Sequence, residues 1–339
     1  MKCALLSVAA LLLLVGCNSS TDNNAPAPAP SSGTPAANTG KKLKVALLTP
    51  GPVSDAGWSA MAYDGLTEIK DKLGAEVSNE EASSEEKIKD SMRSYAQKGY
   101  DLIFGHGYEY NAPGVELAAD FPNTVFVSSS GDKTAKNAGA FRFELEQGFY
   151  LAGIMAAKMD TKNHLAMIGG DDVPSIRSTF DAFKAGAESV KPGIKVDEVF
   201  TGSGSDIAKA KAATEQVISS GADFVIHQAN AAAQGVFDAC KDKGVYAFGA
   251  NADQNDNASG AVIASAVIVA KPAFLALAKA VQAGTYTGTV QKFGMKDGAI
   301  DFVVNPKLKD KVPADAQKLL DDTKDKIKNG AVTVPEAKF

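Results

Sequence analysis

The sequence has few cysteines, and they cannot form a disulfide framework. Cys3 and Cys17 lie near the N-terminus, which leaves Cys240 alone in the rest of the 339-residue chain. Cys240 shares an apolar helical face with Val236 and Phe237, a pattern that favours a small buried hydrophobic residue. The fold must therefore depend on ordinary apolar cores, and a hydrophobic content of 45% is sufficient for two domains.

The chain also lacks an excess of positive charge. Its formal net charge is −5 and its isoelectric point is near 5.4. Binding to nucleic-acid phosphates requires a basic face, so this balance argues against nucleic acid as a partner.

No metal-binding motif is present. The three histidines are scattered and follow no ligand spacing. His106 and His227 lie at or just past predicted strand ends, where either could hydrogen-bond a ligand. His164 begins a predicted strand, and we expect it at the surface. The sequence predicts neither a metal nor a cofactor.

A catalytic set is missing as well. Asp171 and Asp172 have no histidine or nucleophile nearby in sequence, and we expect them to cap the following helix. The glycines of Gly202-Ser203-Gly204-Ser205-Asp206 match neither the dinucleotide fingerprint nor a P-loop, so this stretch is expected to be a loop and a helix cap. No G-x-S-x-G nucleophile elbow occurs. The sequence therefore does not predict an enzyme.

Only one apolar run precedes the bulk of the chain, and it is too short to span a bilayer. Residues 4–15 follow Lys2 and end in Leu14-Val15-Gly16-Cys17, which resembles a bacterial lipobox. We expect residues 1–16 to be a signal peptide and Cys17 to carry a lipid that anchors the protein. Residues 17–42 then form the lipidated end and an Ala/Pro/Ser-rich tether, of up to ~70 Å at ~3.1 Å per residue.

From Lys44 onward, short apolar runs alternate with amphipathic helical stretches, as in a mostly parallel sheet covered by helices. The pieces Gly99-Tyr100-Asp101-Leu102-Ile103-Phe104 and Gly221-Ala222-Asp223-Phe224-Val225-Ile226 are similar and favour two similar lobes. Strands are expected at 45–48, 100–105, 125–128, 141–143, 165–169, 196–200, 224–226, 246–250, 262–270 and 300–304. Helices are expected at 55–73, 83–98, 146–159, 180–190, 206–218 and 314–328.

The opening unit of this series is the most informative. A buried strand is followed by the loop Pro50-Gly51-Pro52, after which Asp55 is the expected N-cap of a helix that Gly74 ends. Open α/β sheets bind ligands at such strand-to-helix junctions. Asp55 and Trp58, the only tryptophan, are therefore candidate ligand contacts, although Trp58 could instead be a core residue at the helix start.

This opening resembles that of the basic membrane protein family, purine-nucleoside-binding lipoproteins that serve ABC importers. Further resemblance lies in Phe141-Arg142-Phe143-Glu144 with Gly148 and Gly153, and in Gly249-Ala250-Asn251-Ala252-Asp253-Gln254. It implies a type I periplasmic-binding-protein fold, with two Rossmann-like lobes joined by hinge strands and a ligand cleft between them. The expected lobes are 43–143 plus 253–284 and 144–252 plus 285–339. An extracytoplasmic monomer that works with an ABC permease is implied.

The resemblance also suggests roles for individual residues. Trp58 would stack on a purine base, with Asp55 accepting one of its N–H groups, and Phe180 would cover the opposite face. Phe183 could replace Phe180 in that role or be a core residue. The remaining candidate ligand contacts lie at the hinge or at strand ends: Asn251, Asp253, Gln254, Tyr108, Gln228 and Asn230.

Two departures from the family pattern concern the ligand. The family has Asp where this chain has Asn251, and Lys where it has Ile268, and those two residues contact ribose hydroxyls. The departures predict that a free purine base binds in preference to its nucleoside, unless a shifted alignment brings Lys271 into the second role. A nucleoside-hydrolysing enzyme and an adhesive or signalling surface lipoprotein are alternatives of other classes.

Overall fold

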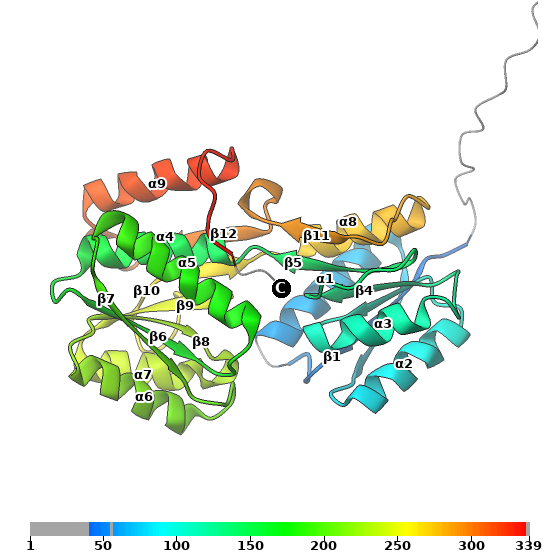
Figure 1. Cartoon of the computed structure of the whole chain (residues 1–339), viewed down its shortest axis with the longest axis horizontal. Coiled ribbons are helices and arrows are strands. Elements are labelled where there is room, and N and C mark those ends of the chain that lie inside the picture. Colours follow the sequence, from blue (N-terminus) through cyan, green and yellow to red (C-terminus); the bar gives the residue numbers. More distant parts are fainter. Residues whose placement is uncertain (1–40, 55–56, 337–339) are drawn as a thin grey trace, which may run out of the picture. The chain divides into compact units, whose positions relative to one another are not determined.

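The computed structural model describes residues 41–54 and 57–336, so Cys17, the expected signal peptide, nearly all of the tether, and Asp55 lie outside the described residues. The described residues belong to one compact unit and contain two six-stranded sheets. Each sheet lies between helices on both of its faces, which defines two lobes (Figure 1). The two α/β lobes expected from the sequence are confirmed.

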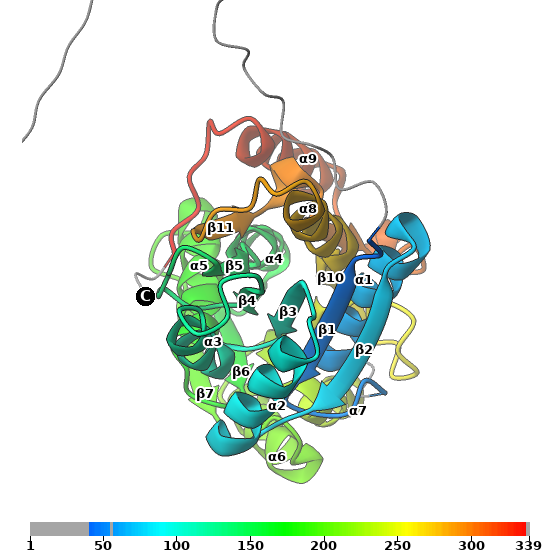
Figure 2. The ribbon, with the colours of Figure 1, turned by 90° about the vertical axis from the view of Figure 1, so that its right-hand side faces the viewer.

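The first lobe is built on the sheet β11-β5-β4-β3-β1-β2, in which every neighbouring pair is parallel. Helices α1 and α8 lie on one face of this sheet and α2 and α3 on the other (Figure 2). The bounds are β1 (Lys44–Thr49), β2 (Glu76–Glu81), β3 (Leu102–Gly105), β4 (Val125–Ser129), β5 (Ala138–Phe143), β11 (Val290–Phe293), α1 (Trp58–Leu73), α2 (Glu85–Gln97), α3 (Asn111–Leu117) and α8 (Ala270–Gln282).

The second lobe repeats this arrangement with the sheet β12-β10-β9-β8-β6-β7, in which only β10 and β12 are antiparallel. Helices α4 and α5 cover one face of the sheet and α6 and α7 the other. The bounds are β6 (His164–Gly169), β7 (Lys195–Phe200), β8 (Phe224–Gln228), β9 (Tyr246–Asn251), β10 (Val262–Ile268), β12 (Ile300–Val304), α4 (Glu146–Met159), α5 (Pro174–Val190), α6 (Ile207–Ser219), α7 (Ala233–Lys243) and α9 (Ala314–Lys328).

Two strands differ from the predicted division into lobes. The segment 253–284 was expected in the first lobe, but β10 pairs with β9 and β12 in the second sheet. The segment from 285 was expected in the second lobe, but β11 pairs with β5 in the first sheet. Helix α8, which packs against α1, lies in the first lobe as predicted, and β12 and α9 lie in the second lobe as predicted. The chain therefore changes lobes after β5, after β10 and after β11.

The helix ends also correct several expected caps. Helix α1 begins at Trp58 with Gly57 as its N-cap, later than an Asp55 cap would require, and Gly74 ends it in the left-handed conformation as expected. Ser84 caps α2 by accepting a hydrogen bond from the backbone N–H of Lys87. Asp206 caps α6 as expected. Helix α5 has Val173 and Pro174 at its start, so neither Asp171 nor Asp172 caps it.

Buried side chains agree with strands covered on both faces. Strand β6 is buried along its whole length, and β1 from Val45 onward. Cys240 is fully buried, as predicted, and burial raises the pKa of its thiol. In the part of the chain that the structure describes, no helix is long and apolar enough to cross a membrane.

Candidate functional site

Four of the candidate residues lie at the carboxyl ends of parallel strands, the edge at which open α/β sheets bind ligands. In the first lobe, Trp58 follows the loop after β1, and Tyr108 follows β3. In the second lobe, Gln228 ends β8 and Asn251 ends β9, its neighbour in the sheet. Two of the predicted contacts of each lobe therefore lie at this edge of its sheet.

Trp58 stacks on His106, which follows β3. The ring centroids are 3.9 Å apart and the planes differ by 21°. The indole Nε1–H donates to the backbone carbonyl of His106 at 3.1 Å, and His106 Nε2 donates to the backbone carbonyl of Trp58 at 2.9 Å. The position of Trp58 is therefore held by contacts of its ring, its indole N–H and its backbone carbonyl.

Ser129 at the end of β4 completes this arrangement, because its Oγ lies 2.8 Å from His106 Nδ1. A carbonyl oxygen only accepts hydrogen bonds, so the contact with Trp58 requires the proton on Nε2. His106 is fully buried, whereas Trp58 is half-buried and packs against the apolar core. Trp58 and Ser129 are among the partners of His106, and its expected role as a possible ligand contact stays a prediction.

In the second lobe, Asn251 donates from Nδ2 to Gln228 Oε1 at 3.1 Å. Both side chains are half-buried. Asn251 has a φ of 68°, a left-handed conformation that asparagine tolerates better than most residues. The two amides, 23 positions apart in sequence, therefore form a pair at the carboxyl edge of the second sheet.

A buried histidine, His227, stabilises the ends of the two strands that carry the amide pair. His227 Nε2 donates to Gln254 Oε1 at 2.9 Å, and the same oxygen accepts the backbone N–H of Ala250 at 2.9 Å. His227 Nδ1 accepts the backbone N–H of Ala229 at 3.3 Å. Burial lowers the pKa of His227 to about 4, so the ring is neutral at physiological pH and holds both strand ends.

The remaining predicted contacts are less well placed. Asp253 is exposed and accepts the N–H of Asn255 in a local turn. Asn230 is also exposed, with a φ of 45°, and Tyr108 is 59% exposed. Phe180 is fully buried, with its ring 6.4 Å from that of Phe149 and 5.6 Å from that of Phe200. Its place in the core leaves no exposed ring face for a ligand.

One aromatic residue at this edge was not predicted. Phe200 ends β7 and is half-buried, and the Arg177 guanidinium lies 4.8 Å from its ring centroid. Arg177 is held by Asp172 and by Glu198, the latter at 3.1 Å, so Asp172 makes an ion pair instead of the predicted cap. The only signal in the sequence was a phenylalanine at the end of a predicted strand.

Ile268 and Lys271, the two alternatives for the lysine position of the family, differ in exposure. Ile268 ends β10, is 7% exposed and pairs in register with Ile300. Lys271 lies exposed in the first turn of α8. The preference for a free base stays a prediction.

His164 corrects an expectation. It is buried rather than at the surface, with Nε2 2.7 Å from Asp197 Oδ2 and Nδ1 donating to the Ser220 carbonyl at 3.1 Å. These contacts tie the starts of β6 and β7 together, at the edge opposite the candidate site. Across residues 41–54 and 57–336, no cluster of three or more His, Cys, Asp or Glu residues is arranged to hold a metal.

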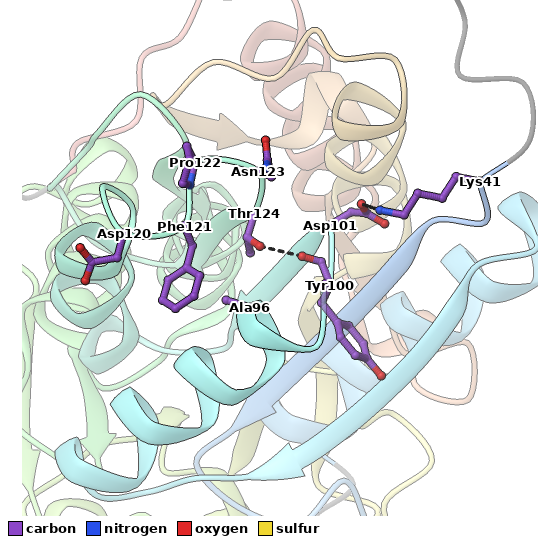
Figure 3. Close-up of a pocket in the computed structure, with 10 residues that line it drawn as sticks. Lys41, Ala96, Tyr100, Asp101, Asp120, Phe121, Pro122, Asn123 and Thr124 are labelled. Atoms are coloured by element: carbon purple, nitrogen blue, oxygen red, sulfur yellow. Dashed lines mark hydrogen bonds and ion pairs between the residues drawn. The ribbon is translucent and has the colours of Figure 1, made fainter.

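A separate cavity of about 550 Å³ lies at the amino ends of β3 and β4 (Figure 3). On its walls, Lys41 pairs with Asp101 at 2.6 Å, and Thr124 Oγ1 donates to the Tyr100 carbonyl at 2.8 Å. This hollow is open to solvent, and these four residues on its wall already bond in pairs. Because it lies at the wrong edge of a parallel sheet, we do not assign it to the candidate site.

Comparison with known proteins agrees with this geometry. A family model described as "ABC transporter substrate-binding protein PnrA-like" matches residues 42–338. A purine-binding protein of Brucella abortus is 30% identical over 298 residues, which cover 87% of this chain and 83% of that protein. The ABC transporter nucleoside-binding protein BmpA of Lactococcus lactis is 29% identical over a match that covers 86% of this chain and 89% of that protein.

The fold likewise has close parallels among solved structures. An ABC transporter solute-binding protein of Conexibacter woesei matches with a TM-score of 0.69, over 87% of this chain and 99% of that one. At 22% identity, this likeness concerns the fold alone. The expected type I arrangement of two Rossmann-like lobes is confirmed.

Proposed function

Because this chain belongs to the family of PnrA-like ABC transporter substrate-binding proteins, we propose that it captures a purine outside the cytoplasm and delivers it to an ABC permease. Members of this family bind solutes and are not enzymes, so the chain is a receptor rather than a hydrolase. We further propose that the ligand site lies between the two lobes, between the Trp58 edge of one and the Gln228–Asn251 edge of the other.

The observation that carries this proposal is the fixed position of Trp58. The indole is held by His106 through a ring stack and two hydrogen bonds, yet it remains half-buried at a strand-to-helix junction. A rigid aromatic surface of this kind suits a flat heterocycle, and stacking a base on it contributes ~1–3 kcal/mol. A purine, the ligand for which the Brucella relative is named, is such a heterocycle.

We propose that free bases bind more tightly than nucleosides. Asn251 and Ile268 occupy the positions at which the resemblance places a carboxylate and an ammonium for ribose. A ribose enclosed beside Ile268 would lose water without gaining a partner, and each buried, unpaired hydroxyl costs ~1–3 kcal/mol.

Titration calorimetry with adenine, guanine, hypoxanthine and their nucleosides tests both statements. Trp58 is the only tryptophan, so its fluorescence gives a second readout at the proposed stacking site. We expect binding of at least one purine with a change in Trp58 emission. Absence of binding to every compound would overturn the purine proposal. A nucleoside that binds tenfold more tightly than its own base would overturn the free-base preference alone.

The anchor is a second proposal, which supports the extracytoplasmic location. We propose that Cys17 is lipidated after cleavage of residues 1–16, because an apolar run ends in Leu14-Val15-Gly16-Cys17. The Cys17→Ser variant should appear in the soluble fraction after cell fractionation. If it remains as firmly membrane-bound as the unmodified protein, the anchor lies elsewhere.

A further inference from the structure

We propose that Gln228 and Asn251 act as one unit that reads the polar edge of the bound base, by presenting one hydrogen-bond donor and one acceptor side by side. This inference rests on the proposed function, since it assumes a purine in the site. It assigns a specificity role that distinguishes purines by the groups on their edge.

The donor and the acceptor follow from the bond between the two side chains. An amide side chain has one carbonyl oxygen and one NH₂ group. The bond from Asn251 Nδ2 to Gln228 Oε1 leaves Asn251 Oδ1 as an acceptor and Gln228 Nε2 as a donor. The opposite assignment of the amides would leave the same two kinds of group, with the residues exchanged. No other described side chain bonds to either amide.

The pair is also rigidly supported, which a specificity element requires. The Gln228 carbonyl accepts the N–H of Gly170 at 2.9 Å, which keeps this strand end within the sheet. Asn251 pairs in register with Val267 of β10. The buried His227 of β8 donates to Gln254, which also accepts the backbone N–H of Ala250 in β9. The backbones of both amides are therefore fixed before a ligand binds.

An aspartate at position 251 would change the chemistry of this edge. The NH₂ group of Gln228 would donate a hydrogen bond to the carboxylate. The side-chain groups of the pair that remain for a ligand would then be chiefly acceptors. Acceptors suit the hydroxyl donors of a ribose. The asparagine keeps a mixed edge, which matches a heterocycle that carries an acceptor nitrogen next to an N–H donor.

The 6-amino group of adenine, next to a ring nitrogen, has this pattern. An amide that makes two hydrogen bonds to such an edge contributes ~1–3 kcal/mol of discrimination. Replacing both hydrogens of the amino group by methyl groups removes the donor while the ring face stays available for stacking. We therefore expect adenine to bind at least tenfold more tightly than N6,N6-dimethyladenine.

The decisive experiment is calorimetric titration of the Asn251→Asp variant with adenine, N6,N6-dimethyladenine and adenosine. Aspartate tolerates the same left-handed backbone, so the fold should be kept. We expect adenine affinity to fall at least tenfold, its advantage over the dimethyl compound to disappear, and adenosine to gain relative to adenine. The matched control is Asn163→Asp, an exposed left-handed asparagine at the opposite edge of the same sheet, which should leave all three affinities unchanged.

A second variant, Gln228→Glu, guards against loss of folding at position 251 and should show the same loss of discrimination. If the wild type binds purines but both folded variants keep adenine affinity and discrimination within twofold, the amide pair has no role in specificity. If only Gln228→Glu folds, its result decides. A wild type that binds no purine would instead refute the proposed function, so the two failures are distinguishable.

Discussion

The two lobes place the same sequence pattern at the same point of each sheet and use it differently. Strand β3 lies between β1 and β4, and β8 lies between β6 and β9. The backbone N–H of Asp101 donates to the Lys44 carbonyl at 2.9 Å, and that of Asp223 donates to the His164 carbonyl at 3.2 Å. Each aspartate also accepts a backbone N–H from the segment that enters the adjacent strand. The similarity noted between these segments is thus structural.

At the carboxyl ends of these strands the lobes diverge. Aligned on the aspartates, His106 of the first lobe corresponds to Gln228 of the second. His106 stacks under Trp58, whereas Gln228 binds Asn251. One lobe therefore offers a flat aromatic surface and the other a polar edge. The difference shows that the shared fold determines the position of a side chain, while the residue type at the strand end determines which contacts that side chain makes.

The largest expected change in stability comes from replacing an aromatic residue of the core, in contrast to one at the candidate site. Phe180→Ala should lower the free energy of unfolding by ~3–5 kcal/mol, because a fully buried phenylalanine leaves a cavity. Chemical denaturation monitored by circular dichroism measures this. Purine affinity of the folded fraction should stay within a few-fold of wild type. A variant of normal stability that no longer binds would place Phe180 in the site after all.

The second effect concerns His227, which has no counterpart in the first lobe because Gly105 occupies the aligned position. Burial lowers the pKa of His227 from 6.5 to about 4. Between these two pH values the unfolded chain therefore binds more protons than the folded protein. The contribution of His227 to the free energy of unfolding is fully present above pH 6.5 and is lost as the pH falls toward 4. At ~1.4 kcal/mol per pH unit, this loss amounts to roughly 3 kcal/mol. The free energy of unfolding of His227→Gln, measured across this range, should change less steeply than that of wild type. Equal slopes would contradict the assignment.

Trp58→Ala should have a smaller effect on stability and a clear effect on binding. The half-buried indole contributes less packing than a core tryptophan, so the loss in unfolding free energy should be below ~3–5 kcal/mol. Purine affinity should weaken tenfold or more, at ~1.4 kcal/mol per decade, as calorimetry can measure. A variant that unfolds readily but binds normally when folded would make Trp58 a core residue only.

The smallest effect contrasts the two equivalent aspartates. Burial raises the pKa of Asp223, and the neighbouring Asp160 carboxyl adds to that shift, so its contribution to stability decreases as the pH rises above about 4. Asp223→Asn should therefore be neutral or slightly stabilising at pH 8. Asp101→Asn loses a partly exposed pair with Lys41 and should destabilise by ~0–1 kcal/mol. Thermal unfolding of both variants at pH 5 and pH 8 checks the opposite signs; shifts of the same sign would contradict the contrast.

Much of the fold could be predicted because apolar periodicity is a local property of the chain. The strand at 300–304 and the helices at 146–159 and 314–328 have their predicted bounds. Strand β2 was missed because its sequence, EVSNEE, carries no apolar alternation, and it forms through pairing with β1 at the edge of the sheet. The assignment of β10 and β11 to lobes failed because pairing partners depend on chain segments far away in sequence.

For the site, the sequence by itself determined the residue types and their places at strand ends: Trp58 after the first strand, and Gln228 and Asn251 after later ones. Only the tertiary structure decided their partners. Trp58 meets His106 across 48 positions because β1 and β3 are neighbours, and Asn251 meets Gln228 because β9 lies beside β8. Phe180 entered the core because α5 turns that face toward the sheet. Periodicity marks the faces of a helix, but the packing of distant segments decides which face is covered.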